Sequence, residues 1–353
     1  IFAKMLNNYG RCRQARGTLT ALFPSSVFML ANSQLSQSLL SDSPVESFSF
    51  AEREIFLKRD DLLHPAFSGN KARKFAYFLD HEFTGVTKLI GHGSAQANSL
   101  YSLSALAKLK GWQCDFYVDH IASHVRTLPT GNYAAAIANG TRVIDLSSLI
   151  AVNPSLHREP NWTCQDYIEQ QVMPAEPKAL FIPEGGRCQY AQYGVSQLAA
   201  EIAAWAESQH ISDLKVFLPA GTGTTALFLN QYFVRQQLNI RVLTCAVVGG
   251  DEYLTQQFYE LSPNAAEHPQ ILNVRKKYHF GKLYPEFYAM WQRLCASGVQ
   301  FELLYDPLGF MVLEDYLRRE QHVSILYIHQ GGLLGNQTML PRYRRKYGEG
   351  DAG

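Results

Sequence analysis

One short segment of the sequence combines turn-forming residues with two closely spaced lysines. Residues 67–75 read FSGNKARKF, and the turn SGN leads into a helix whose apolar face is formed by Phe75, Phe78 and Leu79. Lys71 therefore lies at the N-terminus of that helix, where the positive end of the helix dipole disfavours a cation. Together with burial, this position lowers the pKa of the lysine and supplies the neutral amine that Schiff-base chemistry requires. A lysine considered alone is usually a solvated surface residue, so this interpretation depends on a second site.

A candidate phosphate site lies farther along the chain. Residues 221–225 read GTGTT and stand between an apolar run of strand length and a segment with helical spacing. Gly221 and Gly223 allow the backbone to turn sharply and to approach a ligand closely. The N-terminus of the following helix offers unpaired N–H groups. Three hydroxyl donors are added by Thr222, Thr224 and Thr225. The loop is therefore a candidate cradle for a phosphate monoester; the alternative is a glycine-rich helix start that binds nothing.

The same loop also fits a loose dinucleotide fingerprint. Gly221, Gly223 and Ala226 match the pattern G-x-G-x-x-G/A. A nicotinamide site requires an acidic residue roughly 20 residues farther on, at the end of the next strand. Residues 236–239 (QQLN) occupy that neighbourhood, and Asp251 lies farther away. Three threonines also favour a single phosphate over a pyrophosphate, so the dinucleotide interpretation is the weaker of the two.

The glycine turns belong to a pattern that occurs four times. An apolar run of strand length ends in a glycine-bearing turn, and a segment with helical spacing follows. These strands are expected at residues 87–91, 180–183, 214–218 and 324–328, with others at 115–118, 141–144, 241–248 and 300–304. Strands that alternate with helices indicate an α/β protein with mainly parallel sheets. Ligands bind beyond the carboxyl ends of such strands, where the glycine turns lie.

Two lobes, each with its own sheet flanked by helices, are expected from this pattern. Residues 76–184 are predicted to form a small inserted domain, and residues 29–75 plus 185–345 a large domain, followed by a tail at 346–353. Residues 1–28 contain four basic residues and no acidic residue. They are interpreted as a disordered or non-native leader, with Met29 as the first native residue, and an organellar presequence is the alternative.

The composition excludes several classes of protein. The chain has 353 residues, 46% apolar and 18% charged residues and a net charge of +1, so neither a nucleic-acid nor another polyanionic partner is indicated. It contains no apolar run of roughly 18 residues, so no membrane span is expected. Its six cysteines are scattered without a CxxC pair, which favours a cytoplasmic protein with reduced thiols. His120 and His124 lack the intervening glutamate of a zinc-protease helix, and no metal site is predicted.

The lysine segment and the phosphate loop together resemble a known family. Residues 58–65 (KRDDLLHP) and 68–74 (SGNKARK) are similar to the signature of the 1-aminocyclopropane-1-carboxylate (ACC) deaminase and D-cysteine desulfhydrase family. These are enzymes that use pyridoxal 5′-phosphate (PLP) and have the tryptophan synthase β-like fold. The resemblance runs from about residue 56 to 335. It also includes residues 96–98 (QAN), 183–186 (PEGG), 221–225, 306–307 (DP) and 329–332 (HQGG).

The resemblance implies a role for each of the matched positions. Lys71 would form the Schiff base with PLP, Lys74 and the 221–225 loop would hold its phosphate, and Asn98 would bind its ring hydroxyl. The substrate carboxylate would be received around Ala97, Asn98 and Ser99. PLP would then act as an electron sink for charge at the substrate α-carbon. The family also implies a small amino-acid substrate and a homodimer.

The chain departs from the family near the expected substrate. The family usually has Gln-Ser-Asn where this chain has residues 96–98 (QAN), so Ala97 lacks the hydroxyl that the family places there. Ser94 and Ser99 are nearby hydroxyls, but neither occupies the same position.

A second departure follows Asp306 and Pro307. The family continues with Val-Tyr, then Thr or Glu, then Gly-Lys, whereas residues 308–312 here read LGFMV. The tyrosine is missing, and so is the side chain expected at the pyridine nitrogen. An apolar neighbour there would favour the unprotonated ring and weaken the electron sink. Such a site suits β-elimination of a good leaving group better than opening of the ACC ring.

The leading interpretation is a PLP-dependent lyase or deaminase that acts on a small amino acid and releases ammonia and a 2-oxo acid. D-Cysteine desulfhydration is preferred to ACC deamination. The first alternative is a PLP-binding protein with weak or no catalysis, because Ala97 and Gly309 replace functional side chains of the family. The second alternative, a nicotinamide-dependent dehydrogenase built on the 221–225 loop, leaves the lysine segment unexplained.

Overall fold

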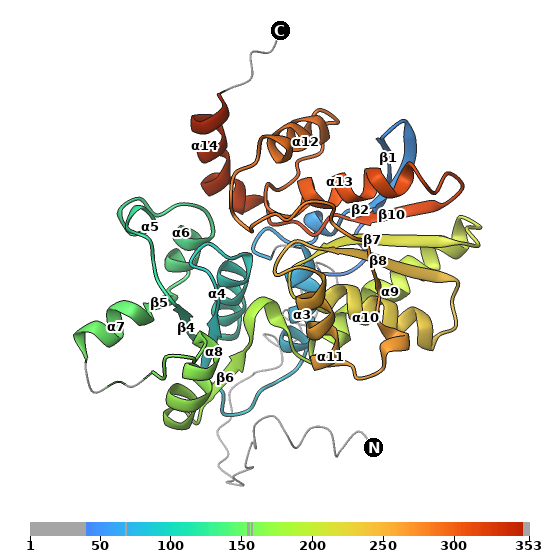
Figure 1. The fold of residues 1–353 in the computed structure, drawn as a ribbon. Helices are drawn as coiled ribbons and strands as arrows, with labels where there is room; N and C mark the ends of the chain where they lie inside the picture. The colour runs from blue at the N-terminus through green and yellow to red at the C-terminus, as the bar shows by residue number, and fades with distance from the viewer. Residues whose placement is uncertain (1–39, 68, 154–155, 157, 349–353) are drawn as a thin grey trace.

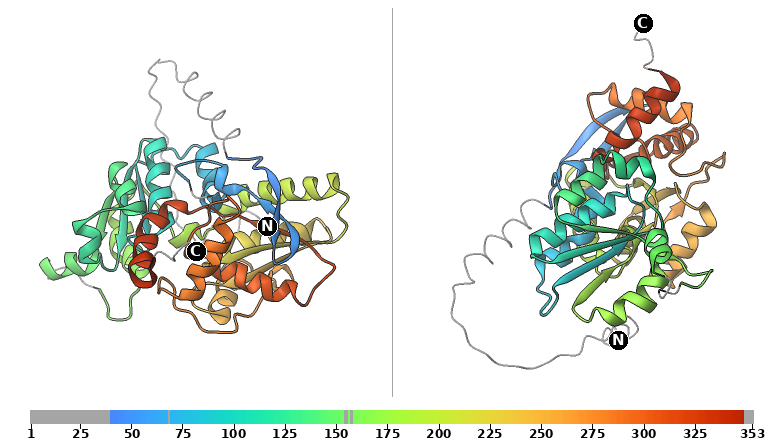
Figure 2. Two further views of the ribbon diagram at one scale, coloured as in Figure 1. Left: turned by 90° about the horizontal axis from the view of Figure 1, so that it is seen from above. Right: turned by 90° about the vertical axis from the view of Figure 1, so that its left-hand side faces the viewer.

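The computed structural model describes residues 40–67, 69–153, 156 and 158–348. The predicted leader at residues 1–28 lies outside this part of the chain. The described residues form two sheets that lie side by side, each flanked by helices (Figure 1). The same arrangement is seen from two further directions (Figure 2). The predicted α/β class with two mainly parallel sheets is therefore confirmed.

The larger sheet has six strands and lies on the right of Figure 1. Its strands, in order across the sheet, are β1 (Val45–Phe50), β2 (Arg53–Lys58), β10 (Ser324–Ile328), β7 (Leu214–Ala220), β8 (Ile240–Ala246) and β9 (Gln270–Ile271). Only the β1–β2 pair is antiparallel. The antiparallel pair places a short hairpin at one edge of an otherwise parallel sheet.

Helices cover both faces of this sheet because the central strands are apolar on both sides. In β7, Val216 and Leu218 belong to the core under α9 (Ala191–Ser208) and α10 (Thr224–Arg235). Phe217, between them, points to the opposite face and packs in the core under α12 (Pro285–Cys295) and α13 (Asp306–Leu317). The remaining helices of this part are α11 (Asp251–Leu261) and α14 (Asn336–Tyr347).

The smaller sheet has four parallel strands in the order β5 (Arg142–Asp145), β4 (Gln113–Val118), β3 (Lys88–His92) and β6 (Ala179–Ile182). Its helices are α4 (Asn98–Lys110), α5 (Ser123–Thr127), α6 (Gly131–Ala138), α7 (Leu146–Val152) and α8 (Cys164–Tyr167). All four strands lie within the segment predicted as a small domain, whose exact boundaries stay a prediction. Within the described residues, no helix combines the length and apolar character needed to cross a bilayer.

Seven of the eight predicted strands are present, and the strand expected at residues 300–304 is wrong. Side chains, and not a neighbouring strand, satisfy the backbone of this segment. The carboxylate of Glu302 accepts hydrogen bonds from the N–H groups of Leu304, Tyr305 and Asp306. Asn336 Oδ1 accepts from the N–H of Leu303 at 3.0 Å. An apolar run is therefore not sufficient for a strand where carboxylate and amide groups compete for its hydrogen bonds.

Helix α3 (Gly69–Asp80) joins the two parts, because it packs against both α9 and α4. Its start touches the chain after β2 so closely that a Cβ on Gly69 would lie 2.6 Å from the carbonyl oxygen of Asp60. Its contact with α9 is equally close: a Cβ on Gly194 would lie 2.1 Å from the carbonyl oxygen of Arg73. Glycine at these two positions lets α3 approach both neighbours directly.

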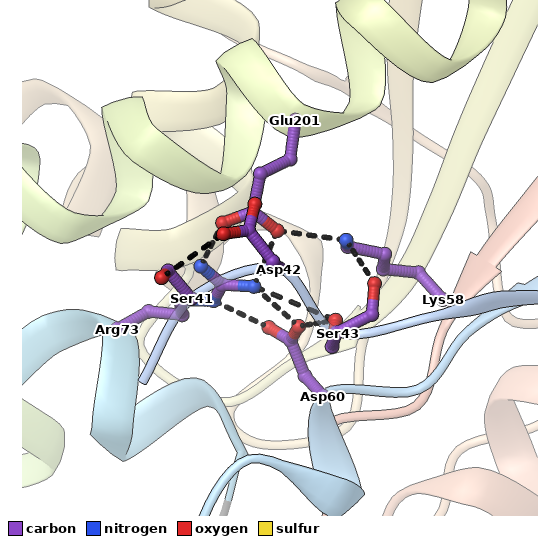
Figure 3. Close-up of polar contacts among 7 residues, drawn as sticks. All are labelled: Ser41, Asp42, Ser43, Lys58, Asp60, Arg73 and Glu201. Atoms are coloured by element: carbon purple, nitrogen blue, oxygen red, sulfur yellow. Dashed lines mark hydrogen bonds and ion pairs between the residues drawn. The ribbon is translucent and has the colours of Figure 1, made fainter. Parts of the chain in front are cut away.

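A buried ion network fixes the position of α3 (Figure 3). The guanidinium of Arg73, which is fully buried, donates to both carboxylate oxygens of Asp60 at 2.8 and 3.1 Å. It also donates to both oxygens of Glu201 in α9 at 2.5 and 2.8 Å. The ammonium of Lys58 completes the network through Glu201 at 2.7 Å and the Ser43 carbonyl at 2.6 Å. Two cations and two anions balance, which is the condition for burying charge in a protein.

We predict that Arg73→Met lowers the free energy of unfolding by about 3–5 kcal/mol, because Asp60 then loses its buried counter-charge and Glu201 keeps only that of Lys58. Urea denaturation followed by circular dichroism measures this. The control is Arg318→Met, which removes an arginine with a 66% exposed side chain paired with Glu314 and Asp315. It should lower the same free energy by less than about 1 kcal/mol. Equal losses in the two variants would show that the network does not hold α3 in place.

Candidate functional site

The predicted site residues converge at the carboxyl ends of strands from both sheets. Lys71 and Lys74 lie in the first two turns of α3, and the 221–225 loop follows β7. The turn after β6 forms the short helix η5 (Glu184–Gly186), and residues 329–332 follow β10. Hydrogen bonds link these segments: the Asn70 N–H donates to the Gln330 carbonyl at 3.2 Å, and the Gln330 side chain donates to the Pro219 carbonyl at 2.8 Å.

Lys71 is a buried lysine with an unusual protonation equilibrium. Its Nζ donates to Asn70 Oδ1 at 3.1 Å. Burial lowers the pKa of its ammonium to about 8, although the negative charge of Glu184 acts in the opposite direction. A substantial fraction of the side chain is therefore the neutral amine near physiological pH. The neutral amine that Schiff-base formation requires is therefore far more accessible at Lys71 than in an ordinary lysine.

Lys74, one turn farther along α3, points toward the phosphate loop. Its Nζ donates to the Gly185 carbonyl at 2.8 Å. Gly185 in turn lies against the loop, because a Cβ on Gly185 would lie 3.1 Å from Cγ2 of Thr222. Burial, followed by the positive charge of Lys71, lowers the pKa of Lys74 well below its ordinary value. An anion bound here would relieve the repulsion between the two lysines.

The 221–225 loop has the backbone and the unpaired groups of an anion cradle. Gly223 is the residue before α10 and has a φ of 68°, a left-handed conformation that favours glycine. The Thr222 and Thr224 hydroxyls are 3.0 Å apart. The Thr225 Oγ1 is buried and has no hydrogen-bond partner among the described residues. Buried hydroxyls are normally paired, so this atom indicates a missing acceptor or donor at the loop.

The residues predicted to receive the substrate carboxylate lie at the start of α4. Asn98 is its first residue and Ala97 precedes it, whereas Ser99 is buried. Asn98 Oδ1 accepts from Asn132 Nδ2 at 2.8 Å, and its Nδ2 lies 2.6 Å from where a Cβ on Gly332 would stand. The start of α4 is therefore held against the turn that follows β10, beside the segment that binds Asn70.

Ser99, one of the two serines near Ala97, is buried in the first turn of α4. Ser94 is exposed, and its Oγ accepts from the N–H of Gln96 at 3.2 Å. The tyrosine side chain that the family has at the position of Gly309 has no counterpart here. A Cβ on Gly309 would lie 3.1 Å from the Pro219 ring and 3.2 Å from the Tyr327 hydroxyl. Proline and tyrosine side chains therefore fill the space beside this glycine.

Two residues at the site had weak or no signals in the sequence. Glu184 belongs to the matched segment at residues 183–186, which carries no assigned role; its Oε1 lies 3.2 Å from where a Cβ on Gly93 would stand, and burial raises its pKa. Tyr305 was not predicted; its hydroxyl lies 3.2 Å from where a Cβ on Gly221 would stand. Its position directly before the DP pair was the available signal. The contact with Gly221 depends on the fold and is not readable from spacing.

The chain is similar in sequence to several named proteins. No family model matches the chain. A Pyrococcus horikoshii protein, provisionally named a 1-aminocyclopropane-1-carboxylate deaminase, is 25% identical over 310 residues, which are 83% of this chain and 90% of the relative. A D-cysteine desulfhydrase of Yersinia pestis is 27% identical over 191 residues, which are 52% of this chain and 55% of that enzyme.

Solved structures share the fold. The crystal structure of an ACC deaminase homologue superposes with a TM-score of 0.71 at 22% identity, covering 92% of this chain and 99% of the other. A hydrogen sulfide-producing enzyme from Fusobacterium nucleatum has a TM-score of 0.58 at 13% identity, covering 89% and 98%. These likenesses confirm the expected fold class and extend over almost the whole chain.

We predict that Thr225→Val weakens PLP binding about tenfold without destabilising the protein. The substitution removes a hydroxyl that has no partner within the described residues, so stability should be unchanged or higher. A lost hydrogen bond to a phosphate is worth about 1.5–3 kcal/mol, which corresponds to at least a tenfold change in affinity. Fluorescence titration with PLP and thermal unfolding measure the two effects. The control is Thr141→Val, which removes another buried, unpaired hydroxyl outside the loop and should leave the affinity unchanged.

Proposed function

Because the chain is a divergent member of the family of ACC deaminases and D-cysteine desulfhydrases, we propose that it is a PLP-dependent lyase or deaminase acting on a small amino acid. The products would be ammonia and a 2-oxo acid. The observation that carries this proposal is the pairing of a buried lysine of lowered pKa, Lys71, with an anion cradle that Lys74 reaches through Gly185.

The residues present suit the phosphate and the aldehyde of PLP. Lys74, the N-terminus of α10 and the unpaired Thr225 hydroxyl would hold the phosphate. Lys71 would hold the aldehyde carbon, and Asn98 would bind the ring hydroxyl. When bound, PLP supplies an electron sink for negative charge that develops at the substrate α-carbon. These assignments of individual residues are proposals that follow from the family and suit the geometry described above.

Lys71 and Glu184 would handle protons during the reaction. The Lys71 Nζ has a pKa of about 8, which would suit it to accept a proton from the substrate and return it. The Glu184 carboxylate lies close enough to raise the pKa of Lys71. The first turn of α4 would bind the substrate carboxylate through its unpaired N–H groups.

D-Cysteine is the substrate that we favour. Gly309 offers no side chain, and the next residue, Phe310, is fully buried in the aromatic core. Neither Gly309 nor Phe310 offers a polar side chain of its own to the cofactor ring, so a substrate with a good leaving group is favoured. D-Cysteine and water would give pyruvate, ammonia and hydrogen sulfide.

The test is the absorbance spectrum of the purified protein with PLP, before and after addition of D-cysteine or ACC. We expect a visible band that Lys71→Ala abolishes, and release of pyruvate and sulfide from D-cysteine. A band that responds to no amino acid of a panel would favour the alternative of a PLP-binding protein without catalysis. A wild-type protein that binds no PLP would refute the proposed function.

We predict that capture of PLP by the cofactor-free protein accelerates with pH through a midpoint near 8. Only the neutral amine of Lys71 reacts, so the rate should fall about tenfold per pH unit below its pKa and level off above it. Stopped-flow absorbance measures the profile. Glu184→Gln should move the midpoint to lower pH, because the carboxylate charge raises the pKa of Lys71. Glu169→Gln, at an exposed position, should leave it unchanged; a midpoint near the ordinary lysine value in the wild type would contradict the prediction.

A further inference from the structure

Tyr305 places a phenol beside the first glycine of the phosphate loop. It is the residue before α13, and its side chain is half-buried. A Cβ on Gly221 would lie 3.2 Å from the Tyr305 hydroxyl and 3.4 Å from Cε1. The edge of the tyrosine ring that carries the hydroxyl therefore lies against the glycine that opens the cradle.

The protein fixes the backbone and ring of Tyr305 but leaves its hydroxyl without a partner. The Glu302 carboxylate accepts from the N–H groups of Leu304, Tyr305 and Asp306 and so holds the chain in place. The ring packs against Phe280 with a centroid distance of 5.3 Å. In the part of the chain that the structure describes, the Tyr305 hydroxyl makes no hydrogen bond, although its backbone groups are paired. A side chain held in this way presents a preorganised donor to a ligand.

The position of Tyr305 directly before α13 places it one helical turn from Gly309, which has no polar group to offer. The Gly309 N–H donates to the Tyr305 carbonyl at 3.0 Å, so the two residues are one helical turn apart. At Gly309 the space is already filled by Pro219 and by the Tyr327 hydroxyl, which donates to Asp306 at 2.6 Å. Burial, followed by the charges of Glu302 and Glu184, raises the pKa of Tyr305, which keeps its hydroxyl protonated.

We propose that Tyr305 is a cofactor-contacting residue, whose hydroxyl hydrogen-bonds the PLP bound in the 221–225 loop. This inference rests on the proposed function, since it requires PLP in the cradle. It adds to the loop a polar group from a separate segment, the turn at residues 302–306 that the Glu302 carboxylate anchors.

The test compares Tyr305→Phe with Tyr347→Phe. The control removes a hydroxyl that donates to the Leu283 carbonyl at 2.9 Å in a different part of the fold. We expect Tyr305→Phe to raise the dissociation constant for PLP about tenfold, which is the effect of one lost hydrogen bond. We also expect it to shift the absorption maximum of bound PLP. Because the hydroxyl has no protein partner in the described residues, the melting temperature of the cofactor-free variant should equal that of the wild type. The control should leave the dissociation constant and the absorption maximum unchanged, whereas its melting temperature should fall slightly because the bond to Leu283 is lost.

A second measurement uses the wild-type protein alone. Nitration of tyrosines by tetranitromethane, mapped by mass spectrometry, should be slowed at Tyr305 when PLP is bound and unchanged at Tyr347. An affinity within twofold of the wild type together with an unshifted spectrum in Tyr305→Phe would overturn the inference, as would equal losses in both variants. A wild-type protein that binds no PLP would instead refute the proposed function and this inference together.

Discussion

The buried ion network around Arg73 is the constraint on which the candidate site depends. Lys71 and Lys74 can face the candidate site only if α3 keeps a fixed position and rotation relative to its neighbours. Arg73 lies between the two lysines on the same helix. Its two bidentate pairs, to Asp60 and to Glu201, join α3 to the segment after β2 and to α9. Hydrogen bonds from Arg73 and Lys58 outweigh the effect of burial and keep the pKa of Glu201 below its ordinary value, so the network stays charged.

This network explains the sequence of the lysine segment in physical terms. In residues 58–61 (KRDD), Lys58 and Asp60 belong to the network, whereas Arg59 pairs with Asp61 and Glu46. In residues 71–74 (KARK), Arg73 belongs to the network, whereas Lys71 and Lys74 face the site. A run of charged residues that looks solvated in the sequence is therefore divided in the fold between the core and the site. The two roles alternate because successive residues of a helix point to different sides.

The fold could be predicted from the sequence because it depends on local patterns, whereas the roles of the site residues stay predictions. Apolar runs that end in glycine turns identified the strands, and the 221–225 loop follows β7 as expected. The prediction of a strand at residues 300–304 is wrong. Nothing in the spacing shows that the side chains of Glu302 and Asn336 accept hydrogen bonds from the backbone of this segment. The position of Tyr305 beside Gly221 and the burial of Arg73 were likewise hidden, since each arises from contacts between distant segments.

The contact between Lys74 and Gly185 also bears on the order in which the molecule assembles. These two residues are 111 positions apart in the chain, and all four strands of the smaller sheet lie between them. Closing so long a loop is entropically unfavourable and normally happens late in folding. An anion site built on such a contact does not exist until both sheets have formed and docked. The PLP proposed to bind here would therefore be acquired by the assembled protein, and it would stabilise the junction between the two sheets after that junction has formed.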